Sequence, residues 1–270
     1  MSEDTERSSL QEDSSRLDLG LDSDIGPVDP PQDTQDDSAE SLHERYEQHG
    51  NLEDLERCIT IYRQEIRSAG DDDLQKTCYA LHNLGAALGT RFEHLGQMND
   101  LEECITSCRR ALELTLEGSP GMPTGLNNLG NALLTRYKSS GNSVDLQDAI
   151  IHYTHAIELT PESSPDMHKW LNSLGNALLT RYESSGNSVD LQDAIIHRTH
   201  AIELTPESSP YMPIQLNNLG LALLTRYNSS GNSVDLQDAI IHYTHAIELT
   251  PESSPYMLTW LSSLGNALLT

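Results

Sequence analysis

The sequence predicts an all-α solenoid, that is, a stack of similar antiparallel helix pairs. The first observation is a 25-residue segment, GNSVDLQDAIIHYTHAIELTPESSP, at residues 141–165, which recurs with one substitution at 186–210 and unchanged at 231–255. A fixed period of 45 residues is typical of one supersecondary unit that packs on its neighbours. The second observation is a Leu-Gly pair that precedes each copy, at residues 129–130, 174–175 and 219–220, and also occurs before and after them, at 84–85 and 264–265.

The negative charge is concentrated at the start of the chain. The 270 residues carry a formal net charge of −26, and residues 1–40 contain thirteen Asp and Glu against two Arg. Residues 1–37 are rich in Ser, Asp, Glu, Gln and Pro and contain no aromatic residue. Such a segment buries too little apolar surface to offset its ordering entropy, so we expect a disordered acidic tail. The acidic balance argues against nucleic acid and membrane partners.

Residues 38–270 form the predicted helical array, with about five helix pairs and a final unpaired helix. A weaker unit covers residues 38–68, a second covers 72–116, and three closely similar units follow. The final helix has no partner before Thr270, so we expect the array to continue in a longer gene product. With no basic and apolar leader and no apolar run near 18 residues, we expect a cytoplasmic protein, with the nucleus as an alternative.

The segments that join the helices can be interpreted residue by residue. Ser164-Pro165 is expected to open a helix, because Ser is a good N-cap and Pro fits the first turn. Leucines at three- and four-residue spacing then predict one apolar face as far as Gly186, which tolerates the positive φ of a helix end. Asp190 is expected in the first turn of the partner helix. Asp145 and Asp148, with Glu158, are interpreted as a solvated helix face.

The spacing within each pair resembles the tetratricopeptide repeat (TPR) family. The second helix reads Ala149-x3-Tyr153-x2-Ala156-x4-Pro161, and the first carries Leu126-x2-Leu129-Gly130. The resemblance implies a TPR-type right-handed superhelical solenoid over about residues 38–270. The 45-residue period exceeds the usual 34 and is most similar to long-period TPR arrays of fungal proteins, which are often linked to CHAT peptidase domains.

The resemblance also implies a function. TPR arrays bind an extended peptide or partner protein along the first helices of their repeats, so we expect a non-enzymatic interaction scaffold with a concave groove. The alternative is a regulatory arm of a larger effector enzyme, such as a CHAT-type peptidase, and a structural spacer without a ligand is a third possibility.

Asparagines on the first helices are the candidate peptide-binding residues. Their amides both donate and accept, so a ladder of them can pair with the backbone of an extended peptide. The residues are Asn127, Asn131, Asn172, Asn176 and Asn217. Leu221 and Ala86 interrupt the ladder, so a merely solvated groove is the competing interpretation.

The remaining motifs give no candidate catalytic or metal site. Histidines recur in register from His152 and His155 onward, but no Cys or carboxylate completes a metal shell, and we interpret them as solvent-facing. No nucleophile, P-loop or metalloprotease motif is found, and no cofactor is expected. Cys104 and Cys108 are interpreted as small apolar residues of one helical face.

Arg198 departs from the repeat pattern, because Tyr153 and Tyr243 hold the same position in the neighbouring units. We expect the guanidinium either to reach solvent or to find an acidic partner.

Overall fold

The computed structural model describes residues 38–69 and 73–270, so the predicted tail at 1–37 lies outside the described residues. Within the described ranges the regular structure consists of eleven α-helices and no strand. The helices are α1 (Ala39–His49), α2 (Leu52–Ala69), α3 (Leu74–Leu95), α4 (Met98–Leu114), α5 (Met122–Ser140), α6 (Ser143–Glu158), α7 (Met167–Ser185), α8 (Ser188–Glu203), α9 (Met212–Ser230), α10 (Ser233–Glu248) and α11 (Met257–Leu268).

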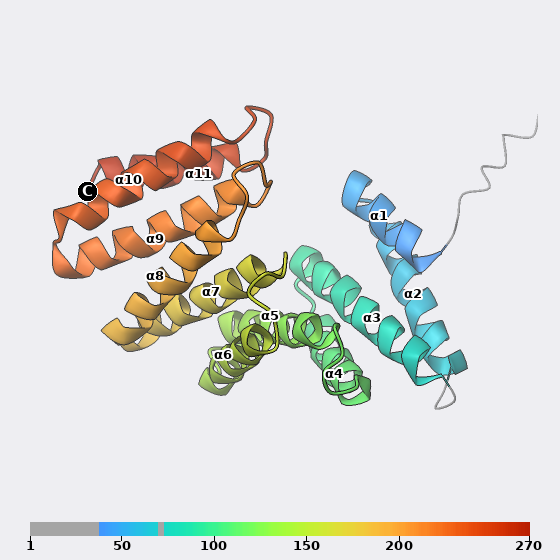
Figure 1. Ribbon diagram of the computed structural model, residues 1–270. Coiled ribbons are helices and arrows are strands. Elements are labelled where there is room, and N and C mark those ends of the chain that lie inside the picture. Colours follow the sequence, from blue (N-terminus) through green and yellow to red (C-terminus); the bar gives the residue numbers. More distant parts are fainter. Residues whose placement is uncertain (1–37, 70–72) are drawn as a thin grey trace, which may run out of the picture. The chain divides into compact units, whose positions relative to one another are not determined.

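Each helix packs against the helix that precedes and the helix that follows it in sequence (Figure 1). From α3 onward, each odd-numbered helix also contacts the next odd-numbered helix. The described residues therefore contain five helix pairs, from α1–α2 to α9–α10, with α11 following the last pair. This arrangement confirms the predicted all-α solenoid.

The joints between helices follow the predicted pattern at one end of each helix and depart from it at the other. Helix α7 ends at Ser185, and Gly186 has a φ of 70°, in the left-handed region that glycine tolerates best. Asn187 then caps α8, because its Oδ1 accepts a hydrogen bond from the Val189 backbone N–H at 3.2 Å.

The predicted opening of a helix at Ser164-Pro165 is wrong. Helix α7 begins two residues after Pro165, at Met167, and residues 162–166 form turns. The Ser164 hydroxyl accepts a hydrogen bond from the Asp166 backbone N–H at 3.3 Å, so this serine stabilises the turn and leaves the helix N-terminus uncapped by its side chain.

The core of each pair is built where small and aromatic residues meet. Ala149, Tyr153 and Ala156 are fully buried on α6, as the repeat pattern predicts. The ring of Tyr153 lies so close to α5 that a Cβ added at Gly130 would be 2.6 Å from it. Glycine at this position is therefore required by the aromatic ring of the partner helix.

An Arg–Asp ion pair joins the two helices of every pair. The arginine lies in the odd-numbered helix, the aspartate lies nine residues later in the first turn of the even-numbered helix, and both guanidinium nitrogens Nε and Nη2 donate to the two carboxylate oxygens. The pairs are Arg45–Asp54, Arg91–Asp100, Arg136–Asp145, Arg181–Asp190 and Arg226–Asp235, with closest N···O distances of 2.6 to 2.7 Å.

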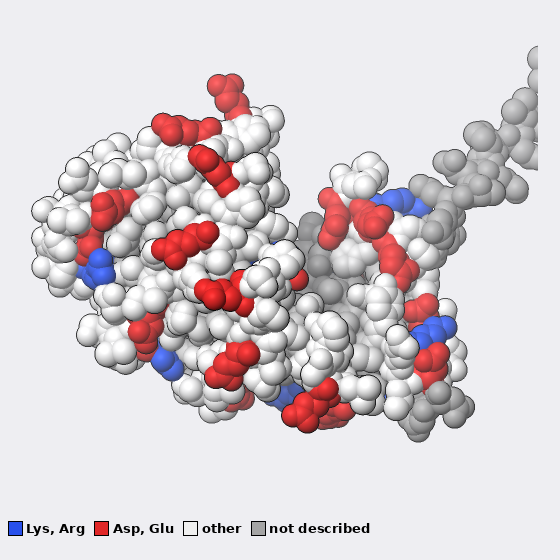
Figure 2. Space-filling model, in the orientation of Figure 1, with Lys and Arg blue, Asp and Glu red and all other residues white. Residues whose placement is uncertain are grey.

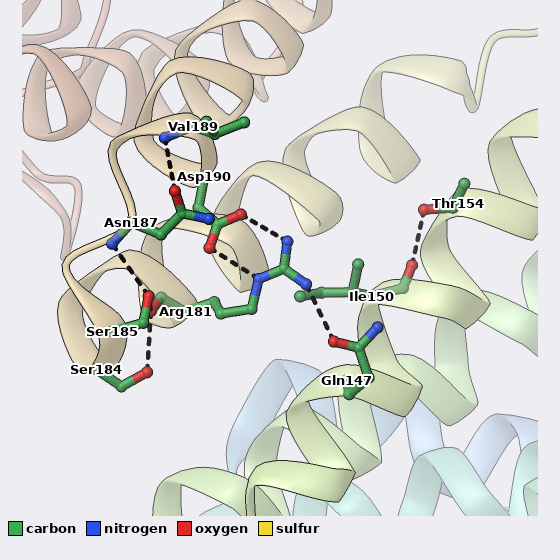
Figure 3. A network of polar contacts seen from close by, with 9 residues as sticks. All are labelled: Gln147, Ile150, Thr154, Arg181, Ser184, Ser185, Asn187, Val189 and Asp190. Carbon is green, nitrogen blue, oxygen red and sulfur yellow. Dashed lines mark hydrogen bonds and ion pairs between the residues drawn. The ribbon is translucent and has the colours of Figure 1, made fainter.

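The same arginine also reaches the preceding helix pair. Figure 3 shows Arg181 of α7 between Asp190 of α8 and Gln147 of α6, whose Oε1 accepts from Arg181 Nη1 at 3.1 Å. Arg136 and Arg226 make equivalent third contacts, with Glu102 and Gln192. One side chain thus connects three helices. Its charge is stabilised there: the hydrogen bond with Asp145, opposed by desolvation, raises the pKa of Arg136.

This contact corrects the interpretation of Asp145 as part of a solvated helix face. Asp145 is only 2% exposed, because the arginine that precedes the glycine joint folds over it. The sequence contained the signal, since an arginine and an aspartate occur nine residues apart in all five units.

We predict that Arg181→Ala lowers the free energy of unfolding by about 3 kcal/mol, because the Asp190 carboxylate stays buried without its partner. Urea unfolding followed by circular dichroism measures the change. Gln147→Ala is the matched control: it removes only the exposed third contact and should cost less than about 1 kcal/mol. Equal losses in the two variants would contradict the role assigned to the ion pair.

Candidate binding face of the odd-numbered helices

Two of the predicted asparagines use their carbonyl oxygens inside the protein. Asn131 is exposed on α5, and its Oδ1 accepts a hydrogen bond from the Tyr153 hydroxyl at 2.8 Å. Asn176 is half-buried on α7, and its Oδ1 accepts from Arg198 Nη2 at 2.6 Å. Within the described part of the chain, the NH2 groups of both asparagines donate to no other residue. Each therefore presents a hydrogen-bond donor in a fixed orientation.

A direct amide contact links two successive odd-numbered helices. Asn218 Nδ2 of α9 donates to Asn172 Oδ1 of α7 at 3.0 Å. Asn172 is one of the predicted residues and Asn218 is not, because the repeat pattern in the sequence points to the column of residues that contains Asn217. One residue further along the helix turns the side chain toward the neighbouring repeat.

Asn127 and Asn217 point into the array. They are 7% and 8% exposed, and the Oδ1 atom of each is buried and has no hydrogen-bond partner among the described residues. The structure thus places the five asparagines in two environments: Asn131, Asn172 and Asn176 lie nearer the surface, and the other two lie inside. Their role in binding stays a prediction.

Arg198 neither reaches solvent nor meets a carboxylate, so both expectations for it are wrong. It is 1% exposed, and its guanidinium donates to Asn176 Oδ1 and to the backbone oxygen of Asn218. Burial lowers the pKa of Arg198 to about 10. Because α9 closes over this position, the side chain is enclosed between α7, α8 and α9, and amide oxygens take the place of an acidic partner.

The histidines divide into two sets. His152, His197 and His242 are half-buried, and desolvation lowers the pKa of each, which corrects the view that all six face solvent. In the other set, His200 Nε2 lies 3.5 Å from Glu162, and His245 Nε2 lies 3.8 Å from Glu207. Among the described residues, no group of three or more His, Cys, Asp or Glu is placed to hold a metal ion.

Acidic side chains outnumber basic ones on the face seen in Figure 2. Five of the arginines are held in the ion pairs with Asp described above, so their charge is balanced within the protein. No described helix is both long and apolar enough to cross a lipid bilayer.

The fold defines a helical-repeat solenoid, and comparison with known proteins makes this more specific. Residues 77–120 match the model of the tetratricopeptide repeat family, which supports the resemblance drawn from the sequence. That segment covers α3 from Thr77 onward, all of α4 and the turn that follows it. No curated protein sequence matches the chain.

Two solved structures share the fold. TTC0263, described as a thermophilic TPR protein in Thermus thermophilus, is 17% identical, with a TM-score of 0.57 over 86% of this chain and 100% of that chain. BtubC from P. vanneervenii is 17% identical, with a TM-score of 0.56 over 80% of this chain and 83% of that chain. At this identity the likeness concerns the fold alone.

We predict that Arg198→Tyr raises the melting temperature by a few degrees, because a neutral ring that fits the repeat replaces a buried charge. The Tyr hydroxyl would donate to Asn176 Oδ1, as Tyr153 does to Asn131. Thermal unfolding followed by circular dichroism measures the change. The reverse variant, Tyr153→Arg, is the control and should lower the melting temperature. An unchanged or lower value for Arg198→Tyr would contradict the register of the repeats.

Proposed function

We propose that this chain is a non-enzymatic interaction scaffold that binds an extended peptide across its odd-numbered helices. The observation that carries the proposal is the direct contact between successive odd-numbered helices, which brings their outward side chains onto one continuous face. The TPR-type fold supports it, because arrays of this kind expose such a face to partners.

Neutral polar side chains characterise this face. The NH2 groups of Asn131 and Asn176 are available as donors, and one helical turn further on each helix carries a threonine, Thr135 and Thr180. Donors of this kind can pair with the carbonyl oxygens of an extended peptide irrespective of its side chains. The arrangement therefore favours recognition of a peptide backbone over recognition of a charged motif.

The proposal predicts that Asn131→Ala with Asn176→Ala weakens peptide binding at least tenfold, at about 1 kcal/mol for each lost hydrogen bond. The probe is a peptide selected from a random display library on the full chain, and the measurement is calorimetric titration. Because alanine also deprives Tyr153 and Arg198 of their acceptors, Asn131→Asp with Asn176→Asp is needed as a second variant. It keeps an oxygen for each internal bond and removes the donors, and it also adds two negative charges, whose effect on binding is separated by repeating the titration at higher salt.

Leu221 provides a matched variant that is expected to strengthen peptide binding. It holds the position of Asn131 and Asn176 on α9 and is 42% exposed, so Leu221→Asn adds one amide to the same face. This variant should bind the selected peptide more tightly. If both double variants bind the selected peptide with unchanged affinity, the assignment of Asn131 and Asn176 to the binding site is wrong.

One observation favours a second candidate function, in which the array is the regulatory arm of a larger effector enzyme such as a CHAT-type peptidase. Leu261 and Leu268 of α11 are 47% and 63% exposed, whereas the equivalent Leu216 and Leu223 of α9 are buried beneath α10. A helix supplied after Thr270 would cover them. Sequencing the transcript beyond Thr270 tests this candidate: a further helical repeat or an effector domain supports it, and a stop codon contradicts it.

A further inference from the structure

The second unit differs from the others at two positions, one on each of its two helices. Gly89 of α3 stands where the later odd-numbered helices have a buried leucine, at Leu134, Leu179 and Leu224. Cys108 of α4 stands where three other even-numbered helices have a buried tyrosine, at Tyr62, Tyr153 and Tyr243. This unit therefore lacks an isobutyl group and a phenol ring that the repeat otherwise packs at this place.

A cavity of about 170 Å³ occupies the place of the missing groups. Gly85 and Gly89 of α3, Cys104 and Cys108 of α4, and Asn128 and Asn131 of α5 line it. Its border includes the exposed residues Ala86, Glu93 and Asn131, so it opens to solvent on the face of the odd-numbered helices.

The position of the cavity matches that of the side chain held there in the other units. Arg198 packs against Gly175 and reaches Asn176 and the backbone of Asn218, between α7, α8 and α9. The equivalents of these three residues, 90 positions earlier, are Gly85, Ala86 and Asn128. All three line the cavity. The cavity therefore lies in the slot between three helices that Arg198 fills in its own unit. In the second unit no arginine or tyrosine fills this slot.

We propose that this slot binds the aromatic side chain of a tyrosine or phenylalanine from a peptide partner. The proposal rests on the peptide-binding function above and deepens it, because the ring would anchor the peptide beside Asn131. A cavity of about 150 Å³ with an apolar lining is large enough to bind benzene. The neighbouring units supply the closest precedent, since their own tyrosine rings fill the same slot.

The lining suits an aromatic ring chemically as well as in size. Gly89 leaves room for the ring to approach the helix backbone, whereas the Cys108 sulfur already lies against Gly85. The sulfur atoms of Cys104 and Cys108 make favourable contacts with ring edges. A hydrogen bond with Cys104, together with burial, raises the pKa of Cys108, so this thiol stays neutral at physiological pH. The amides of Asn128 and Asn131 at the wall can pair with a phenol hydroxyl.

Titration of the full chain with p-cresol, the free side chain of tyrosine, tests the slot by two-dimensional NMR. We expect saturable shifts of residues around the cavity in the millimolar range. Cys108→Tyr and Gly89→Leu each restore the group found in the other units and should weaken p-cresol binding at least tenfold. Cys78→Ala, which removes a thiol of α3 outside the cavity, is the matched control and should leave binding unchanged.

Gly89→Leu keeps the test decisive if Cys108→Tyr does not fold. A Cβ at Gly89 would have only the Cys104 sulfur within 4 Å, at 3.8 Å, and leucine is a better helix former than glycine. Absence of saturable p-cresol binding, or binding that both filling variants leave unchanged, would overturn the proposal.

A second ligand distinguishes a peptide side chain from a free aromatic compound. N-acetyl-tyrosine methylamide carries the same ring on a peptide backbone and should bind at least as tightly as p-cresol. If it binds more than tenfold more weakly than p-cresol, the slot excludes a ring that is attached to a peptide backbone. The proposal that the ligand is a peptide side chain would then be wrong. Neither ligand is an extended peptide, so these titrations test the slot alone. The asparagine variants test the proposed peptide-binding function, and the two proposals can fail independently.

Discussion

The ion pair between an arginine and an aspartate nine residues later is the constraint on which the array depends. The guanidinium is planar and carries donors in a fixed fork, so it can hold both carboxylate oxygens and still offer a third nitrogen to the preceding pair. Arg181 does this for Asp190 and Gln147. In the last three pairs, closing the pair of helices and docking it on the previous pair are therefore carried out by the same side chain.

The prediction of the fold succeeded because the 45-residue period and the helical spacing of leucines are local signals. The ion pair was missed although its residues were visible, because two charged side chains near a helix end are ordinarily solvated. Only tertiary packing shows that Asp145 is covered. The predicted start of α7 was wrong for a related reason. Ser164 can act as an N-cap, but its hydroxyl accepts its hydrogen bond within the turn that precedes the helix.

The candidate site could be predicted only in part. Periodicity identified the column of Asn131 and Asn176, but a shift of one residue in a helix turns a side chain by about 100°. This separates the buried Asn217 from Asn218, which contacts Asn172. Likewise, the sequence marked Arg198 as a departure but gave no sign that a backbone oxygen and an amide oxygen would accept hydrogen bonds from its two terminal nitrogens. Those partners come from helices 20 residues or more away in the chain.

The near-identity of the last three units leads to a further conclusion about specificity. Identical units present the same groups at each step, so a peptide bound only to them could shift by one repeat at little cost in free energy. Departures from the repeat break this equivalence. Leu221 interrupts the amide column, Arg198 replaces a ring, and Gly89 with Cys108 leaves a slot open in one unit alone. A ring held in that slot would fix the register of a peptide whose backbone the remaining units recognise without regard to sequence.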